Sequence, residues 1–445
     1  MKLKYLILGL LLIALSCSEW QTKPESLVRF QEPWTSPFQV DSLQPYQLVN
    51  REGKHLLILN KTAWAYFGMN DPEGFLKRSK AQGVNVIRVA FVGAPYFEDL
   101  HIELWPWEGS IENPDFSGYD ESYWDEVEKR IKMAGEYGIG IDFNIYNTVR
   151  EEAHKYPEQN KFWKIILDRF GKYSNILTWE IMNEYLGNQK FQDSVGSFFY
   201  ENDKWNRPVI TSDGTTDDAA WPDKEWMGMS VVHTCTGSGP KHDLKDWYLA
   251  VARNSRAHGK PAFNNESGRE KRHKNDDPEH RRKQSWIWYA AGCHWTWHSW
   301  EGCEGIEDPK YRGPGAQYLK PVTEFFRSLP FWKMNPNFTI LNTTSLDWFS
   351  VILADSQRKN SIVYICTTET GKSIPESPIK LRLPDGIYNI EFIDPATLKT
   401  LKSISLTSQN LGFLKTVTLP GFTDDIVLKI KLVETRERSM IKGTE

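Results

Sequence analysis

The chain has little of what marks several large classes of protein. Its 54 basic residues are outnumbered by 58 acidic ones, and a net charge of −4 argues against a nucleic-acid-binding protein. Its 5 cysteines are too few and too scattered for a disulfide scaffold, although Cys293 and Cys303 could either pair in an oxidising compartment or stay buried as free thiols. Beyond the N-terminus, no stretch is long and apolar enough for a membrane helix.

Aromatic residues, by contrast, are abundant. The chain has 19 Trp, 18 Tyr and 22 Phe, and its share of tryptophan is well above the usual one. Such rings can fill a core, but they also provide the flat surfaces that stack on apolar faces of ligands. Composition alone does not decide between these two uses.

The N-terminus carries the pattern of an export signal. Four residues with two lysines precede an apolar stretch that ends at Leu15 and is too short to span a bilayer. The stretch runs into Ala-Leu-Ser-Cys, which resembles a bacterial lipoprotein signal. We therefore expect residues 1–17 to be this signal, Cys17 to carry a lipid anchor, and the protein to lie in the bacterial cell envelope. An ordinary cleaved signal peptide is the alternative.

An N-terminal extension over residues 18–45 leads into a long segment, residues 46–332, in which apolar runs alternate with amphipathic stretches. Repeated β-α units over this length predict a (β/α)8 barrel. A doubly wound sheet is the rival, but no glycine-rich phosphate loop follows its first strand. The expected strands span residues 55–60, 85–92, 140–146, 177–183, 208–212, 229–234, 261–265 and 293–298. Residues 215–226, between the fifth and sixth strands, lack a convincing helix.

The pattern changes after Pro330. Seven short apolar runs separated by turn residues predict an all-β sandwich domain over residues 336–435. The whole chain is thus expected to be α/β, a (β/α)8 barrel followed by a small all-β domain.

Acidic residues mark the ends of two predicted barrel strands. The fourth strand finishes in Asn183-Glu184, and the seventh finishes at Glu266. Active sites of (β/α)8 barrels lie at the carboxyl ends of the strands, where residues from opposite sides of the barrel can face each other. Two facing carboxyl groups are what glycoside hydrolysis requires.

In these positions the sequence resembles the glycoside hydrolases of clan A, which place an Asn-Glu pair after strand four and a glutamate after strand seven. Arg88 in strand two and His233 in strand six also match the clan. More narrowly, the chain resembles a group of barrel hydrolases whose C-terminal domain is described as collagen-binding. That match rests on Gly53-Lys54, Thr62-Ala63-Trp64 and Phe392-Ile393-Asp394-Pro395.

The resemblance implies a role for each matched residue. Glu184 is the expected general acid, Glu266 the ionised nucleophile supported by Arg88, and Asn183 a donor to the sugar 2-hydroxyl. His233 is expected in the substrate site. A strand-eight Trp, either Trp297 or Trp295, is expected to form the floor of the sugar site. From their positions near strand ends, Trp300 is a further candidate for stacking, and Trp64 could either shape the site or serve in packing.

The predicted activity is therefore that of a glycosidase that retains anomeric configuration, acting on a polysaccharide or oligosaccharide with no cofactor. Retention requires the two carboxyl groups to lie about 5–5.5 Å apart. A non-catalytic glycan- or protein-binding surface lipoprotein on the same scaffold is the alternative.

Basic residues crowd the loop that follows Glu266, at 269, 271–274 and 281–283. The acidic residues interleaved among them are typical of a solvated, exposed run of charges. The more specific alternative is that the loop binds a sulfate or carboxylate group of an anionic glycan. Nearby histidines and cysteines show no dependable metal-ligand spacing, so we predict no metal site.

Overall fold

A computed structural model describes residues 27–93, 97, 100–147, 151–184, 189–214, 216–234, 243–268, 270, 277–299, 313–409 and 414–435. Several predicted features lie outside these residues, namely the export signal with Cys17, Trp300, Cys303, and the basic residues at 269 and 271–274. Cys293 is a buried free thiol. The described residues include no helix with the length and hydropathy needed to cross a membrane.

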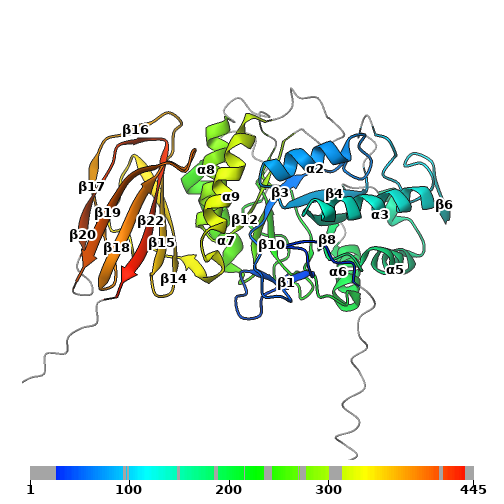
Figure 1. Ribbon diagram of the computed structural model, residues 1–445. Helices are drawn as coiled ribbons and strands as arrows, with labels where there is room; N and C mark the ends of the chain where they lie inside the picture. Colours follow the sequence, from blue (N-terminus) through cyan, green and yellow to red (C-terminus); the bar gives the residue numbers. More distant parts are fainter. Residues whose placement is uncertain are drawn as a thin grey trace, which may run out of the picture.

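Eight parallel strands form a nearly closed barrel, as predicted (Figure 1). Their order is β10-β11-β12-β3-β4-β7-β8-β9, and a bridge from Val209 to Met227 brings the last strand near the first. The strands are β3 (Leu59–Thr62), β4 (Val86–Val92), β7 (Gly140–Tyr146), β8 (Ile176–Met182), β9 (Val209–Ile210), β10 (Ser230–His233), β11 (Ala262–Glu266) and β12 (His294–Trp297).

Helices cover the outside of the barrel, and three of them, α2, α3 and α8, begin at an aspartate that caps the first turn. Asp277 accepts a hydrogen bond from the His280 amide, and Pro278 opens α8 at its first turn, as predicted. No helix occurs in the described residues between β9 and β10. The helices are α2 (Pro72–Ala81), α3 (Glu121–Glu136), α4 (Glu151–His154), α5 (Gln159–Phe170), α6 (Gln189–Asn202), α7 (Leu249–Ala257), α8 (Pro278–Ala290) and α9 (Leu319–Arg327).

Successive side chains of each strand point to opposite faces, so that alternate residues face the barrel interior. Several of these inward-facing residues are polar. In β4, Arg88 points inward, whereas its apolar neighbours Ile87 and Val89 belong to the core shared with the helices. Asp142 in β7 and Glu180 in β8 repeat the pattern, and all of these residues are fully buried. Polar groups therefore line the path toward the strand ends, where the candidate site lies.

The N-terminal extension is folded over part of its length. A hairpin of β1 (Phe38–Val40) and β2 (Leu48–Asn50) packs Trp34, Phe38 and Leu48 against the residues that begin the barrel strands. This packing closes the end of the barrel opposite the candidate site. A second hairpin, β5 (Trp107–Gly109) with β6 (Pro114–Tyr119), follows β4.

The C-terminal domain is an all-β structure of antiparallel strands. Its main sheet has the order β13-β14-β15-β22-β18-β19, and its inner face shares a core with the β17–β20 ribbon. The strands are β13 (Met334–Pro336), β14 (Trp348–Asp355), β15 (Asn360–Thr367), β16 (Ser373–Ile374), β17 (Ser377–Leu381), β18 (Gly386–Ile393), β19 (Thr400–Ser408), β20 (Lys415–Leu419), β21 (Phe422–Thr423) and β22 (Asp425–Glu434).

Helix α8 joins the two domains, lying between the barrel and the main sheet (Figure 1). Trp286 stacks on Tyr364 of β15 with 5.5 Å between ring centroids. Arg282 makes two hydrogen bonds, of 2.7 and 3.1 Å, to the buried carboxylate of Asp425. Lys283 Nζ lies 2.9 Å from Asp424 Oδ1. Because such buried charges are costly without their partners, the sheet and the barrel depend on each other.

Candidate active site

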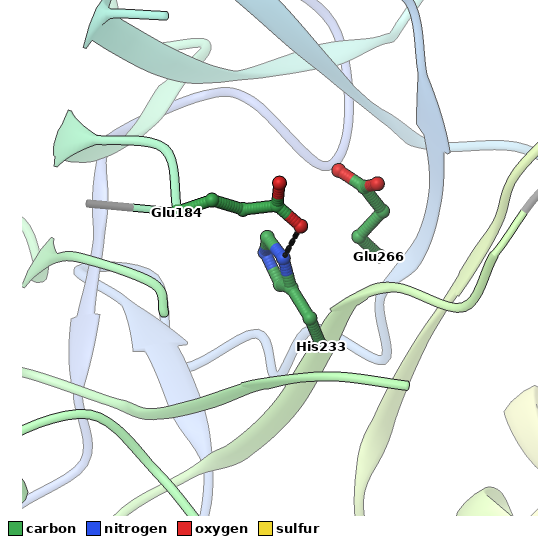
Figure 2. Close-up of side chains that lie close together, drawn as sticks. All are labelled: Glu184, His233 and Glu266. Carbon is green, nitrogen blue, oxygen red and sulfur yellow. Dashed lines mark hydrogen bonds and ion pairs between the residues drawn. The ribbon is translucent and has the colours of Figure 1, made fainter. Parts of the chain in front are cut away.

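Three ionisable side chains meet at the carboxyl ends of the barrel strands (Figure 2). Glu184 follows β8, His233 ends β10 and Glu266 ends β11. Figure 2 shows the two carboxyl groups turned toward each other, with His233 beside Glu184. His233 Nδ1 lies 3.0 Å from Glu184 Oε1, and one polar atom from each of the three side chains lies within 4.8 Å of the others. Sequence reasoning named all three.

An irregular register between β10 and β11 places Glu266. Val232 pairs with Asn264, but the next residue, His233, pairs with Glu266, so that Asn265 is bulged out of the pairing. Strict alternation would turn only one of two successive residues inward. With the bulge, Asn265 Nδ2 donates to Glu180 Oε1 at 3.1 Å, and Glu266 also reaches the barrel interior.

Glu184 has an unusual backbone. Its φ of +51° lies in the left-handed region, which non-glycine residues seldom adopt. Such strain persists only where the surroundings enforce it, and it is concentrated at functional sites. The Glu184 amide donates to Ser212 Oγ at 3.4 Å. The Glu184 side chain keeps 33% of its surface exposed, so a substrate can reach its carboxyl group.

Arg88 is the centre of the hydrogen-bond network below these groups. Its guanidinium donates Nη1 to Glu266 Oε2 at 2.8 Å and binds Glu180 through both Nε, at 2.7 Å, and Nη2. Nη2 also donates to Asn183 Oδ1 at 2.8 Å. Two carboxylates raise the pKa of Arg88 above its ordinary value against the effect of burial. The sequence prediction that Arg88 supports Glu266 therefore agrees with this geometry.

Glu180 is a member of this network that was not predicted from the sequence. It lies four residues before Glu184, within β8, and it is fully buried. A buried charge needs an opposite charge, and Arg88 two strands away needed one as well. The complementary pair was thus a signal already present in the sequence.

Asp142 stands next to this pair. Burial, and then the charge of Glu180, raises the pKa of Asp142 to about 8, although Arg88 and hydrogen bonds from Thr178 and Asn265 act in the other direction. The structure therefore favours a neutral Asp142 at pH 7, leaving Arg88 to balance the charges of Glu180 and Glu266.

Two further residues border the site. His298, which follows β12, has Nδ1 3.5 Å from Glu266 Oε1. Asp213 follows β9, and burial raises its pKa, with the charge of Glu184 adding to the effect and His233 opposing it. Neither residue was proposed for the site from sequence.

The aromatic residues expected to contact sugar have other contacts. Trp297 is fully buried, and its Nε1 donates to Glu270 Oε2 at 3.2 Å. A ring with no accessible face does not stack on a ligand, so this structure gives Trp297 a packing role instead of the predicted one. Trp64 is 3% exposed, and the Arg88 guanidinium lies 4.1 Å from its ring centroid. Trp64 thus supports Arg88 from one side.

The basic residues after Glu266 that the structure describes, residues 281–283, do not have the contacts expected if they bound an anionic glycan. Arg281 donates to Ser267 O at 2.8 Å, whereas Arg282 and Lys283 hold the C-terminal domain. These three residues do not extend toward a substrate. The prediction for the remaining basic residues of the loop falls outside the described part.

The polar atoms of Glu184, His233 and Glu266 are close enough to approach one metal ion. The charges around them favour another use. Glu266 is already paired with the Arg88 guanidinium at 2.8 Å, which repels a second cation, and Glu184 is hydrogen-bonded to His233. The arrangement is better suited to moving a proton and holding a carboxylate ionised.

Comparisons with known proteins identify the family. The sequence profile described as "Apiosidase-like, catalytic domain" matches residues 44–333. The chain belongs to this family. It is accordingly a glycosidase, and the facing carboxyl groups of Glu184 and Glu266 lie at the carboxyl ends of its barrel strands. No curated protein sequence matches the chain.

Solved structures share the two-domain fold. A structure described as a glycoside hydrolase has a TM-score of 0.70 at 16% identity, covering 91% of this chain and 99% of the other. A glycoside hydrolase family 5 protein from Bacteroides vulgatus has a TM-score of 0.71 at 16% identity, covering 91% of this chain and 95% of its own. At this identity the likeness establishes the fold.

Replacing Asp142 with Asn tests the charge state of the buried network. A carboxyl group whose pKa is raised on folding makes the folded state lose stability as pH rises from about 4 to about 8, because the unfolded chain releases its proton first. Asn cannot ionise. We expect the free energy of unfolding of Asp142→Asn, relative to the original protein, to rise over this range by at least about 1.4 kcal/mol, the equivalent of one pKa unit. Urea denaturation at several pH values measures the free energy of unfolding of both proteins. A constant difference between the two proteins across this pH range would contradict the raised pKa of Asp142.

Proposed function

We propose that the protein hydrolyses O-glycosidic bonds with retention of anomeric configuration, by a double displacement on Glu266. The observation that carries the proposal is the spacing of the two carboxyl groups, whose nearest oxygens lie within 4.8 Å. Retaining enzymes hold the two groups about 5–5.5 Å apart, whereas inverting enzymes need about 6.5–9.5 Å to admit a water molecule. The spacing favours direct attack by a carboxylate.

Glu266 is suited to be the nucleophile. Its side chain is only 11% exposed, and the hydrogen bond from Arg88 Nη1 to its Oε2 stabilises the ionised form. The other oxygen, Oε1, faces His298 and attacks the anomeric carbon in the first step. As the new C–O bond forms, the bond to the leaving group breaks, which gives a covalent glycosyl-enzyme ester.

Glu184 is suited to be the acid and then the base. It is more exposed than Glu266, and its link to His233 Nδ1 fixes the direction of its carboxyl group. It gives its proton to the departing oxygen in the first step. In the second step the resulting carboxylate takes a proton from water, and that water releases the sugar from Glu266.

The substrate class proposed here is an oligosaccharide or polysaccharide. The family description makes glycosides of apiose the first substrates to test. The sequence hypothesis of an anionic glycan has no support from Arg281, Arg282 and Lys283, and it stands only for the basic residues outside the described part of the loop.

Replacing Glu266 with Gln tests the nucleophile. Gln keeps the shape but lacks the charge needed for attack, so we expect glycan hydrolysis to fall by roughly 10³-fold or more. Anomeric proton signals of the product of the original protein, followed by NMR from the start of the reaction, are expected to show the configuration of the substrate. The opposite anomer as first product would contradict the double displacement.

A matched control separates loss of chemistry from loss of fold. Glu136→Gln, at an exposed side chain that ends α3 just before β7 begins, makes the same change at the opposite end of the barrel. We expect it to hydrolyse substrate like the original protein, and Glu266→Gln to stay folded by circular dichroism. Near-normal turnover by folded Glu266→Gln would overturn the assignment.

We also propose that the protein is a lipoprotein of the bacterial cell envelope, anchored through Cys17. The support is the sequence pattern around Cys17, which lies outside the described residues. In a bacterial host grown with labelled palmitate, the full chain is expected to carry the label in the membrane fraction and Cys17→Ser is expected to lack it. Equal labelling of the two proteins would contradict the anchor.

A further inference from the structure

A pocket of about 390 Å³ lies where the barrel meets the C-terminal domain. On the barrel side its walls include Ala257, at the end of α7, and Ala291, just after α8. These residues precede β11 and β12, so the pocket lies at the amino ends of the strands, opposite the carboxyl ends that present Glu184 and Glu266. On the other side, the wall comes from residues between 336 and 352, which run from the end of β13 into β14.

Arg256 brings a buried positive charge to this pocket. The residue is 7% exposed, and its guanidinium lies 3.9 Å from the centroid of the Tyr46 ring. It donates to two neutral acceptors, Gly292 O and Asn335 Oδ1, both at 2.7 Å. Burial lowers the pKa of Arg256, as expected for a charge that no carboxylate balances.

Arg253, one helical turn earlier on α7, adds a second guanidinium. It lies 5.3 Å from the ring centroid of Phe338, a large apolar side chain that is 69% exposed. Partial burial is the cause that lowers the pKa of Arg253. Within the described part of the chain, no ion pair joins Arg253 or Arg256 to a carboxylate, and none of the described residues lining the pocket is acidic.

The remaining wall is mostly apolar. Leu341, Val351 and Ile352 contribute aliphatic surface, and Thr343 and Thr344 contribute hydroxyl groups. A cavity of this size falls in the range of small-molecule sites, which combine apolar walls with a few polar groups that fix the ligand. Two positive charges with no negative charge select an anion, and the apolar wall selects an organic one.

We propose that this pocket binds a small organic carboxylate, with a body about the size of one sugar ring. Its carboxylate pairs with the planar guanidinium of Arg253, in the field of Arg256, and its body lies against Leu341 and Val351. Both sugar acids and aromatic acids have this chemistry. The proposal does not depend on the reaction at Glu266, because the two sites lie at opposite ends of the barrel.

Calorimetric titration of the full chain tests the proposal with four probes, namely glucuronate, benzoate, neutral glucose and inorganic sulfate. We expect saturable binding of glucuronate or benzoate. The acid that binds with the higher affinity shows whether the pocket prefers sugar acids or aromatic acids. Glucose and sulfate are expected to bind at least tenfold more weakly. Failure of both carboxylates to bind, or binding of glucose or sulfate equal to theirs, would overturn the proposal.

Arg253→Gln shows whether any binding occurs in this pocket. Loss of a charge-assisted hydrogen bond is expected to weaken carboxylate binding by roughly tenfold. Arg51→Gln is the matched control, because Arg51 lies 4.4 Å from the centroid of the Trp205 ring and does not line the pocket. It is expected to bind the carboxylate normally. Since the side chain of Arg253 is partly exposed and has no ion pair among the described residues, its variant is expected to melt at the same temperature as the original protein. Unchanged affinity in folded Arg253→Gln would place the ligand elsewhere and contradict the proposal.

Discussion

The buried guanidinium of Arg88 is the interaction on which the site depends. A fully buried cation is tolerated only with opposite charge and well-formed hydrogen bonds. Arg88 obtains both from Glu180, deeper in the barrel, and from Glu266, at the strand end. The Trp64 ring covers the guanidinium, with its centroid 4.1 Å away. The same contacts that stabilise the cation hold Glu266 in one orientation and favour its ionised form. The contacts that stabilise the barrel interior are thus the same ones that orient the proposed nucleophile.

Backbone irregularities complete the arrangement that Arg88 organises. Regular strands turn alternate residues inward, which suffices for Arg88, Asp142 and Glu180. It does not suffice for both Asn265 and Glu266, and the bulge at the β10–β11 pairing allows both to face the interior. Glu184, whose carboxyl group faces that of Glu266, has a left-handed backbone. These local departures from regular geometry occur where the two carboxyl groups meet.

Much of the fold could be predicted because it depends on periodic patterns. All eight barrel strands lie within a few residues of their predicted positions, since each is a short, mainly apolar run and most are separated by helical segments. Residues 38–50 escaped prediction, because a three-residue strand such as β1 or β2 has too few positions to show alternation. Likewise the bulge that positions Glu266 has no signature in a single sequence.

The candidate site could be predicted only in part, and Trp297 shows why. Its position at a strand end was inferred correctly, but burial depends on what packs over the ring, and Glu270 comes from a loop whose path no pattern reveals. Arg282 and Lys283 are similar, because their partners Asp425 and Asp424 lie in another domain. Sequence periodicity places residues along an element, whereas contacts between distant segments determine their use.

The central claim is that Glu266 forms a covalent bond to the sugar. If Glu184 is the acid and base, Glu184→Gln is expected to slow release of that intermediate, because no carboxylate remains to activate water. A substrate with an activated leaving group is expected still to allow the first step. Mass spectrometry of peptides from this variant, quenched during turnover, measures the claim most directly. We predict one glycosyl adduct, on the peptide that contains Glu266 and at that residue. Turnover with no adduct on Glu266, or with the adduct on another carboxylate, would contradict the account.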